Sequence, residues 1–161
     1  MQLHEDAKPD LMKATPSKTV VRSWARLMKL QQSALAKAED ALKAAGFPPL
    51  SWYDVLLELE RVGEAGMRPF ELEAQMLLAQ HNLSRLIDRM ETAGYVERRE
   101  CQDDGRGQMV MITSVGRNLR RRMWPVYADV IQRVIGSRIS ERQVKTLNEV
   151  LGVLLDLAAV K

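Results

Sequence analysis

Residues 83–113 read LSRLIDRMETAGYVERRECQDDGRGQMVMIT, and this stretch decides the fold. Apolar side chains recur three and four positions apart in its first part, at Leu83, Leu86, Ile87 and Met90. That spacing predicts a helix that begins near Gln80 and ends before Gly94. Two extended runs follow, and they flank Asp104-Gly105. Asp-Gly between extended runs is a strong hairpin signal, because glycine tolerates the positive φ that such turns need.

Three further helices are expected before this stretch. The first covers about residues 19–45, where apolar residues repeat along two seams, and Pro48-Pro49 prevents its continuation. The second begins with Ser51 as its cap, and Asp54 three positions later completes a capping box. The third begins near Pro69, a residue that suits the first turn of a helix.

Two helices are expected after the hairpin. The first covers about residues 114–135, and the second begins at Ser140, with Gln143 at the reciprocal capping position. A helix pair followed by a β-hairpin is the order of elements in a winged helix-turn-helix. The predicted fold class is therefore mainly α with a small β-hairpin wing.

The expected domain organisation is a short tail followed by one domain. Residues 1–17 are polar and unpatterned, which indicates a flexible tail. Within the domain of residues 18–161, residues 50–113 hold the winged helix-turn-helix. The helices of residues 18–46 and 114–161 exceed what that module needs for its own core. We therefore interpret them as a platform for dimerisation.

The composition excludes several classes of protein. The chain of 161 residues carries a formal charge of only +3, one cysteine (Cys101) and two histidines, so neither a disulfide nor a zinc site is expected. It contains no catalytic triad motif, P-loop or dinucleotide-binding turn, and we predict neither an enzyme nor a cofactor. It also lacks a long apolar run and a signal peptide, which predicts a cytoplasmic protein without a membrane segment.

The fourth predicted helix presents a polar face opposite its apolar stripe. That face holds His81, Ser84, Arg85, Asp88 and Thr92, with Arg89 at its flank. A guanidinium can donate two hydrogen bonds to guanine in the major groove, and a hydroxyl suits bases or phosphates. A solvated helix surface is the plain alternative.

Arginine is concentrated from the fourth helix onward. Residues 81–122 contain nine arginines, six acidic residues and no lysine. Arg106 lies beside the glycine-flanked hairpin tip, where it could enter a minor groove, and Asp103 or Asp104 could hold it by ion pairing. The alternatives are a solvated turn for Arg106 and, for Arg120 to Arg122, a helix surface lying over apolar neighbours.

Four motifs together resemble the MarR family of bacterial transcription regulators. They are SRLIDRME at 84–91, AGYVER at 93–98, DGRG at 104–107 and ITSVG at 112–116. They occur in the family's order and with its spacing, and the resemblance covers roughly residues 20–158. It implies an obligate homodimer in which each winged lobe reads half of a palindromic double-stranded DNA operator.

The resemblance also assigns roles to single residues. It implies that Ser84 and Arg85 occupy DNA-contact positions, that Arg89 lies near phosphates or in an internal ion pair, and that Arg106 is at the wing tip. The remaining candidates for DNA contact are Gln80, His81, Asn82 and Asp104. The chain departs from the family at Ala79 and His81, where Ser or Thr is usual. Because alanine is a poor cap, the start of the recognition helix can shift.

Many members of this family release DNA when a small, often aromatic or phenolic, molecule binds. The resemblance implies that Trp24, Met28, Trp52 and Tyr53 surround such an effector, with packing anchors as the alternative for the tryptophans. We therefore predict a repressor that an effector releases. A redox-responsive regulator acting through Cys101 and a winged-helix adaptor that binds proteins are the competing interpretations.

Overall fold

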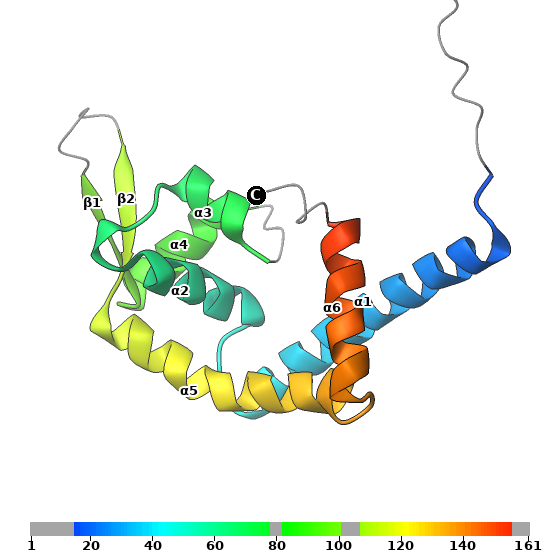
Figure 1. Cartoon of the computed structure of the whole chain (residues 1–161). Coiled ribbons are helices and arrows are strands. Elements are labelled where there is room, and N and C mark those ends of the chain that lie inside the picture. The colour runs from blue at the N-terminus through cyan, green and yellow to red at the C-terminus, as the bar shows by residue number, and fades with distance from the viewer. Residues whose placement is uncertain (1–14, 78–81, 101–106, 156–161) are drawn as a thin grey trace, which may run out of the picture. The chain divides into compact units, whose positions relative to one another are not determined.

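The computed structural model describes residues 15–77, 82–100 and 107–155. The chain divides into two compact units, Met1–Ser33 and Ala34–Lys161, and each is described by itself. The elements, shown in Figure 1, are α1 (Lys18–Ala44), α2 (Leu50–Val62), α3 (Pro69–Gln75), α4 (Leu83–Thr92), β1 (Val96–Glu100), β2 (Gln108–Ile112), α5 (Ser114–Ile131) and α6 (Glu141–Leu154). The predicted class, mainly helical with a small hairpin, is confirmed. None of these helices is both long and apolar enough to cross a membrane.

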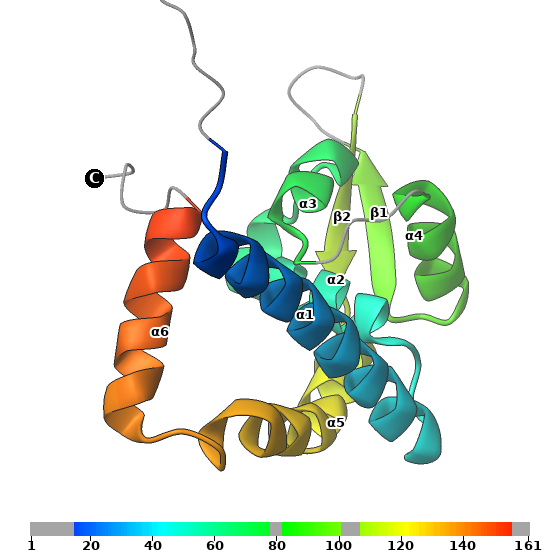
Figure 2. The same cartoon turned by 90° about the vertical axis from the view of Figure 1, so that its right-hand side faces the viewer.

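The hydrophobic core of the second unit is centred on α2. Its residues Val55, Leu56 and Leu59 are fully buried, and α2 contacts α3, α5 and β2. The two strands pair antiparallel, with Val96 opposite Ile112. Both views show that α6 stands apart from the lobe formed by α3, α4 and the hairpin (Figures 1 and 2). No residue of α6 is buried.

The start of α2 differs from the prediction. The helix begins at Leu50, after Pro49, and no side chain of the predicted capping box caps it. With this earlier start Ser51 is already inside the first turn, and Asp54 is only 4% exposed. The cap comes from α1 instead, because the Glu39 carboxylate accepts the Leu50 N–H at 3.2 and 3.3 Å. The capping box predicted for α2 is therefore wrong.

The capping box predicted for the last helix is confirmed. The Ser140 side chain accepts the N–H of Gln143, and the Gln143 side chain accepts the N–H of Ser140. This cap needs only residues that are close in the sequence, which is why the local pattern was sufficient to find it.

A short link ties the connection before α3 to the wing. Met67 and Val110 exchange backbone hydrogen bonds of 3.0 and 2.8 Å. Gly66 precedes this bridge with φ +67°, and a Cβ atom there would lie 2.8 Å from the Val110 carbonyl oxygen. A residue with a side chain would therefore push β2 away from this link.

Aromatic and charged contacts join α2 to α5. The Tyr53 ring lies 6.3 Å from that of Trp124 and 5.3 Å from that of Tyr127. Arg120 forms an ion pair with Glu60, and its guanidinium lies 6.0 Å from the centre of the Tyr53 ring. Arg120 thus covers aromatic packing, as the helix-surface interpretation of the arginine triplet expects.

Candidate nucleic-acid interface

Helix α4 begins at Leu83, later than the start predicted near Gln80. Its cap is Asn82, whose side-chain oxygen accepts the N–H of Arg85 at 3.2 Å. Asparagine is among the best N-cap residues, whereas Ala79 offers no acceptor. The Asn82 carbonyl group is therefore committed to the helix end, although its amide N–H groups stay available.

The two faces of α4 divide as the spacing predicts. The apolar stripe of Leu83, Leu86, Ile87 and Met90 is buried in the core. Ser84, Arg85 and Arg89 lie on the exposed face. Neither guanidinium has an ion-pair partner within residues 15–77, 82–100 and 107–155. The buried face anchors the helix to the core. The opposite face therefore presents to the solvent two guanidiniums that have no ion-pair partner among the described residues.

A clamp on Arg98 fixes α4 against β1. One terminal nitrogen of Arg98 donates to the Asp88 carboxylate at 2.6 Å, and the other forms an ion pair with Glu91. The Arg98 backbone N–H also donates to Glu91 at 3.0 Å. Three polar contacts therefore hold the first wing strand against the predicted recognition helix.

The surroundings of Arg98 favour its charged form. Burial by itself lowers the pKa of Arg98, but hydrogen bonds and charge attraction from Asp88 and Glu91 outweigh it and raise that pKa above its ordinary value. The guanidinium is therefore always charged. The internal ion pair that one alternative assigned to Arg89 is made by Arg98 instead, and Arg89 is left exposed.

The base of the wing is closed by Thr113 and Gly116. The Thr113 hydroxyl donates to the Gly94 carbonyl at 2.7 Å, and its oxygen accepts the N–H of Gly116 at 3.0 Å. A Cβ atom on Gly116 would lie only 2.1 Å from the carbonyl oxygen of Tyr95. The end of α4 and the start of α5 therefore approach so closely that only glycine fits.

The structure does not test every predicted contact residue. Gln80, His81, Asp104 and Arg106 lie outside the described residues, as does Cys101. The described candidates Asn82, Ser84, Arg85 and Arg89 all belong to α4 or its cap and are exposed. They share one helix with the clamp, so the backbone of that helix fixes their spacing.

The predicted effector residues occupy separate environments. Trp24 and Met28 lie one helical turn apart on the part of α1 that belongs to the first unit, and Trp24 is exposed. In the second unit, Trp52 packs edge-on against Tyr95, with ring centres 5.7 Å apart. Tyr53 is buried instead in the aromatic contacts with α5. Trp52 and Tyr53 therefore face different elements.

Sequence reasoning missed the Arg98 clamp and the Glu39 cap. Arg98 and Glu91 both stand in the motifs that carry the family resemblance, so their positions were singled out without their pairing. The sequence does carry a signal for this pairing. Arg98 is the third residue of the first wing strand, and from that position its side chain can reach back over the preceding helix. Glu39 had no such signal, because it caps a helix eleven residues further along the chain.

Known proteins are similar to this chain in sequence. A model of the MarR family matches residues 45–107. The transcriptional repressor MprA of Escherichia coli (strain K12) is 26% identical over 128 residues, which are 80% of this chain and 72% of that protein.

Solved structures share the fold. The MarR family transcriptional regulator Sco3205 from Streptomyces coelicolor, in complex with DNA, has a TM-score of 0.79 and 22% identity, over 88% of this chain and 89% of the other. The organohalide-sensing regulator RdhR-CbdbA1625 in its 2,4-dichlorophenol-bound form has a TM-score of 0.71 and 15% identity, over 91% and 88%. Together with the matching motifs, these comparisons confirm the predicted resemblance to the MarR family, whose model matches residues 45–107.

Proposed function

We propose that this protein is a transcription regulator that binds a palindromic double-stranded DNA operator as a homodimer and acts as a repressor. The observation that carries the proposal is the exposed pair Arg85 and Arg89 on a helix whose position is locked by Arg98. A reading helix needs unpaired donors and a fixed orientation, because base contacts depend on hydrogen-bond geometry. The likeness to Sco3205, which is solved with DNA, supports this assignment.

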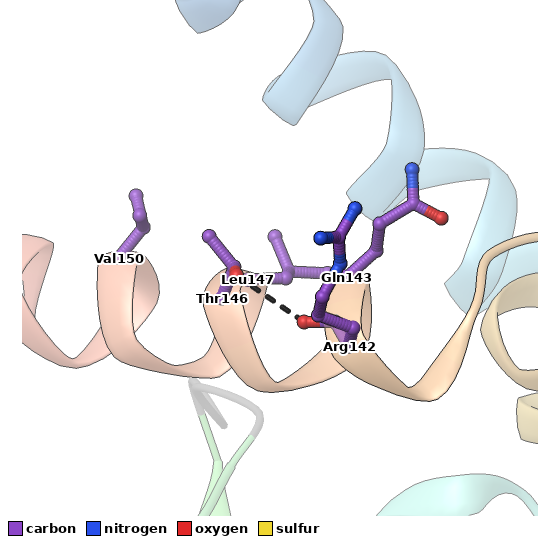
Figure 3. Close-up of a pocket in the computed structure, with 5 residues that line it drawn as sticks. All are labelled: Arg142, Gln143, Thr146, Leu147 and Val150. Carbon is purple, nitrogen blue, oxygen red and sulfur yellow. Dashed lines mark hydrogen bonds between the residues drawn. The ribbon is translucent and has the colours of Figure 1, made fainter.

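An unpartnered surface on α6 supports the homodimer. Figure 3 shows a groove along one face of this helix, lined by Arg142, Gln143, Thr146, Leu147 and Val150. Within one protomer, Val150 is half exposed to solvent, and Val153 and Leu154 are more than half exposed. A helix of 14 residues with no buried side chain lacks the packing that stabilises most helices in proteins. We propose that a second copy of this chain packs against the exposed apolar face of α6. The dimerisation helices are then those of residues 18–46 and 114–161.

We further propose that a small aromatic molecule releases the DNA. The similar organohalide-sensing regulator, solved in its 2,4-dichlorophenol-bound form, supports this ligand class. Trp24, Met28, Trp52 and Tyr53 are our candidates for the effector site. Such a ligand acts only if it binds the released arrangement better than the DNA-bound one, since equal affinity shifts no equilibrium.

The test begins with DNA. Duplexes that flank the protein's own coding region and duplexes selected from a randomised library would be titrated against the full chain by fluorescence anisotropy, over a series of salt concentrations. We expect saturable binding by one dimer per site that survives an excess of unrelated duplex. The apparent affinity should fall steeply with salt, because phosphate contacts release counterions.

Variants assign the contacts. Arg85→Gln should weaken operator binding by about 1–3 kcal/mol and relax the preference at one base pair. Arg61→Gln removes the same charge from α2, outside both α4 and the helices assigned to the dimer. It is the control and should change affinity little, provided that circular dichroism shows it to be folded. Two results together would contradict sequence-specific regulation: wild type and Arg85→Gln bind every duplex equally, and the library yields no enriched sequence. They would favour a winged-helix adaptor that binds proteins.

A further inference from the structure

A cavity lies at the base of the wing, where α4 ends and α5 begins. It has a volume of about 440 Å³ and is lined by Tyr95, Ser114, Val115, Asn118, Leu119, Arg121 and Arg122. In Figure 1 this region is found where the strands of the hairpin meet the start of α5. Cavities of this size accommodate small organic ligands.

The cavity has a strong positive charge. Two guanidiniums line it, and none of its lining residues is acidic. The stretch from Ser114 to Ala128 contains no aspartate or glutamate. Of its four arginines, Arg120 is compensated by Glu60. In the part of the chain that the structure describes, Arg121 and Arg122 have no ion-pair partner.

The environment of Arg122 leaves its donors available. Its guanidinium lies over the Phe47 ring, 5.5 Å from the ring centre. A cation–π contact positions a guanidinium without using its N–H groups. Arg122 is therefore oriented by an apolar neighbour and can still donate hydrogen bonds to an oxyanion.

The remaining lining residues suit a ligand with a ring. Tyr95 is half-buried, and its ring is held by the edge contact with Trp52. Leu119 is buried and Val115 is exposed at the cavity, which provides an apolar wall. Ser114 and Asn118 add a hydroxyl and an amide that can orient a polar head group.

We propose that this cavity binds a phosphate monoester of a small, ring-bearing molecule. A phosphate monoester carries about −1.5 to −2 charges at pH 7 and three strong acceptor oxygens, which match two uncompensated guanidiniums and two neutral donors. A carboxylate would compensate only one of the two cations. The ring would pack on Tyr95 and the apolar wall. This site is separate from the exposed face of α4, and it goes beyond the proposed DNA-reading function.

The experiment uses the full chain without DNA and three probes. Phenyl phosphate supplies both the dianion and the ring, phenyl sulfate keeps the shape with a single charge, and inorganic phosphate lacks the ring. Binding would be followed by NMR through the side-chain N–H signals of Asn118, Arg121 and Arg122, assigned by substitution. We expect phenyl phosphate to shift these signals saturably and to bind roughly tenfold more tightly than either other probe.

Variants test the assignment of the cations. The double variant Arg121→Gln with Arg122→Gln should lose the binding of phenyl phosphate, and Asn118→Ala should weaken it while both arginines stay. Arg117→Gln removes one charge from the same helix outside the cavity and should leave the affinity within about twofold. Circular dichroism would establish that each variant is folded.

Three results would overturn the proposal. The first is equal affinity for phenyl sulfate and phenyl phosphate, since the second charge would then not be recognised. The second is undiminished binding by the folded double variant. The third comes from a final titration in which an unrelated duplex is added to the complex with phenyl phosphate. Displacement of phenyl phosphate by that duplex would make the cavity part of a DNA-backbone contact. None of these results depends on whether the chain regulates transcription.

Discussion

Helices α4 and α6 are both amphipathic, yet their surroundings within one protomer differ completely. In α4, four of ten residues are buried, and its acidic side chains are held by Arg98. In α6, none of 14 residues is buried, and Val150, Val153 and Leu154 are at least half exposed to solvent. Amphipathic spacing alone therefore does not show whether the apolar face of a helix packs against its own chain.

This contrast separates two kinds of stability. The packing of α4 is intramolecular, so its stability should not depend on protein concentration. A helix covered by a second copy gains stability only as the dimer forms, and therefore depends on concentration. Four variants, the first with two substitutions, compare the cover that α6 needs from outside the chain with contacts made inside it, beginning with the largest expected effect.

Replacing Leu151 and Leu154 on α6 by aspartate should abolish the dimer. Each leucine loses about 1.5–3 kcal/mol of apolar burial, so the dimer dissociation constant should rise at least about 100-fold. Sedimentation equilibrium measures this directly. Lys145→Asp changes the charge on the opposite side of α6 and should leave the dimer intact. An unchanged dissociation constant in the double variant would remove α6 from the interface.

Gly116→Ala should destabilise the wing lobe by about 3 kcal/mol, because the new methyl group meets a backbone carbonyl that cannot move without separating α4 from α5. The loss would be measured by urea denaturation. Gly152→Ala on α6 is the control, since no atom of another element in the described part of the chain lies within 4 Å of the added Cβ. It should stabilise that helix by up to about 1 kcal/mol. Similar stability of Gly116→Ala and wild type would refute the close approach.

Arg98→Gln should cost about 1–2 kcal/mol of folding free energy. The Arg98 side chain is 18% exposed, but Asp88 and Glu91 are 61% and 39% exposed, so water screens part of the loss. Arg99→Gln removes a neighbouring pair with Glu97 in which both partners are well exposed, and it should cost less than about 0.5 kcal/mol. Thermal denaturation of both variants provides the comparison. Equal losses would show that Arg98 is only a surface pair.

Glu39→Ala should have the smallest effect, about 1 kcal/mol, because it removes the acceptor that caps α2. Hydrogen exchange at the Leu50 amide should accelerate in this variant. Asp40→Ala, at the exposed neighbouring position, should leave both stability and exchange close to wild type. If the Leu50 amide exchanges equally fast in both variants, the cap contributes nothing.

The sequence predicted those features that depend on residues near one another. The helical stripe of α4, the hairpin and the Ser140 capping box all followed from spacing. The start of α2 did not, because its cap comes from Glu39, across Pro48-Pro49. No local pattern can show a carboxylate that arrives from another helix.

The same limit applied to the candidate site. The arginines were visible in the sequence, but which of them pair and which stay free depends on the three-dimensional positions of Asp88, Glu91 and Glu60. Arg85 and Arg89 are unpaired in the part of the site that the structure describes, where the two carboxylates of α4 pair with Arg98 instead. Which arginines form ion pairs and which stay unpaired could therefore be determined only from the folded structure.

The clamp has a consequence for the rate at which the protein would find DNA. Taken alone, α4 carries two arginines and two acidic residues, so its formal charge is zero. Arg98 adds one positive charge to this assembly, which makes its net charge +1. Long-range attraction accelerates the encounter of oppositely charged molecules and fades with ionic strength. If the chain binds DNA as proposed, a side chain whose hydrogen bonds all go to its own protein would thus help to set the association rate constant.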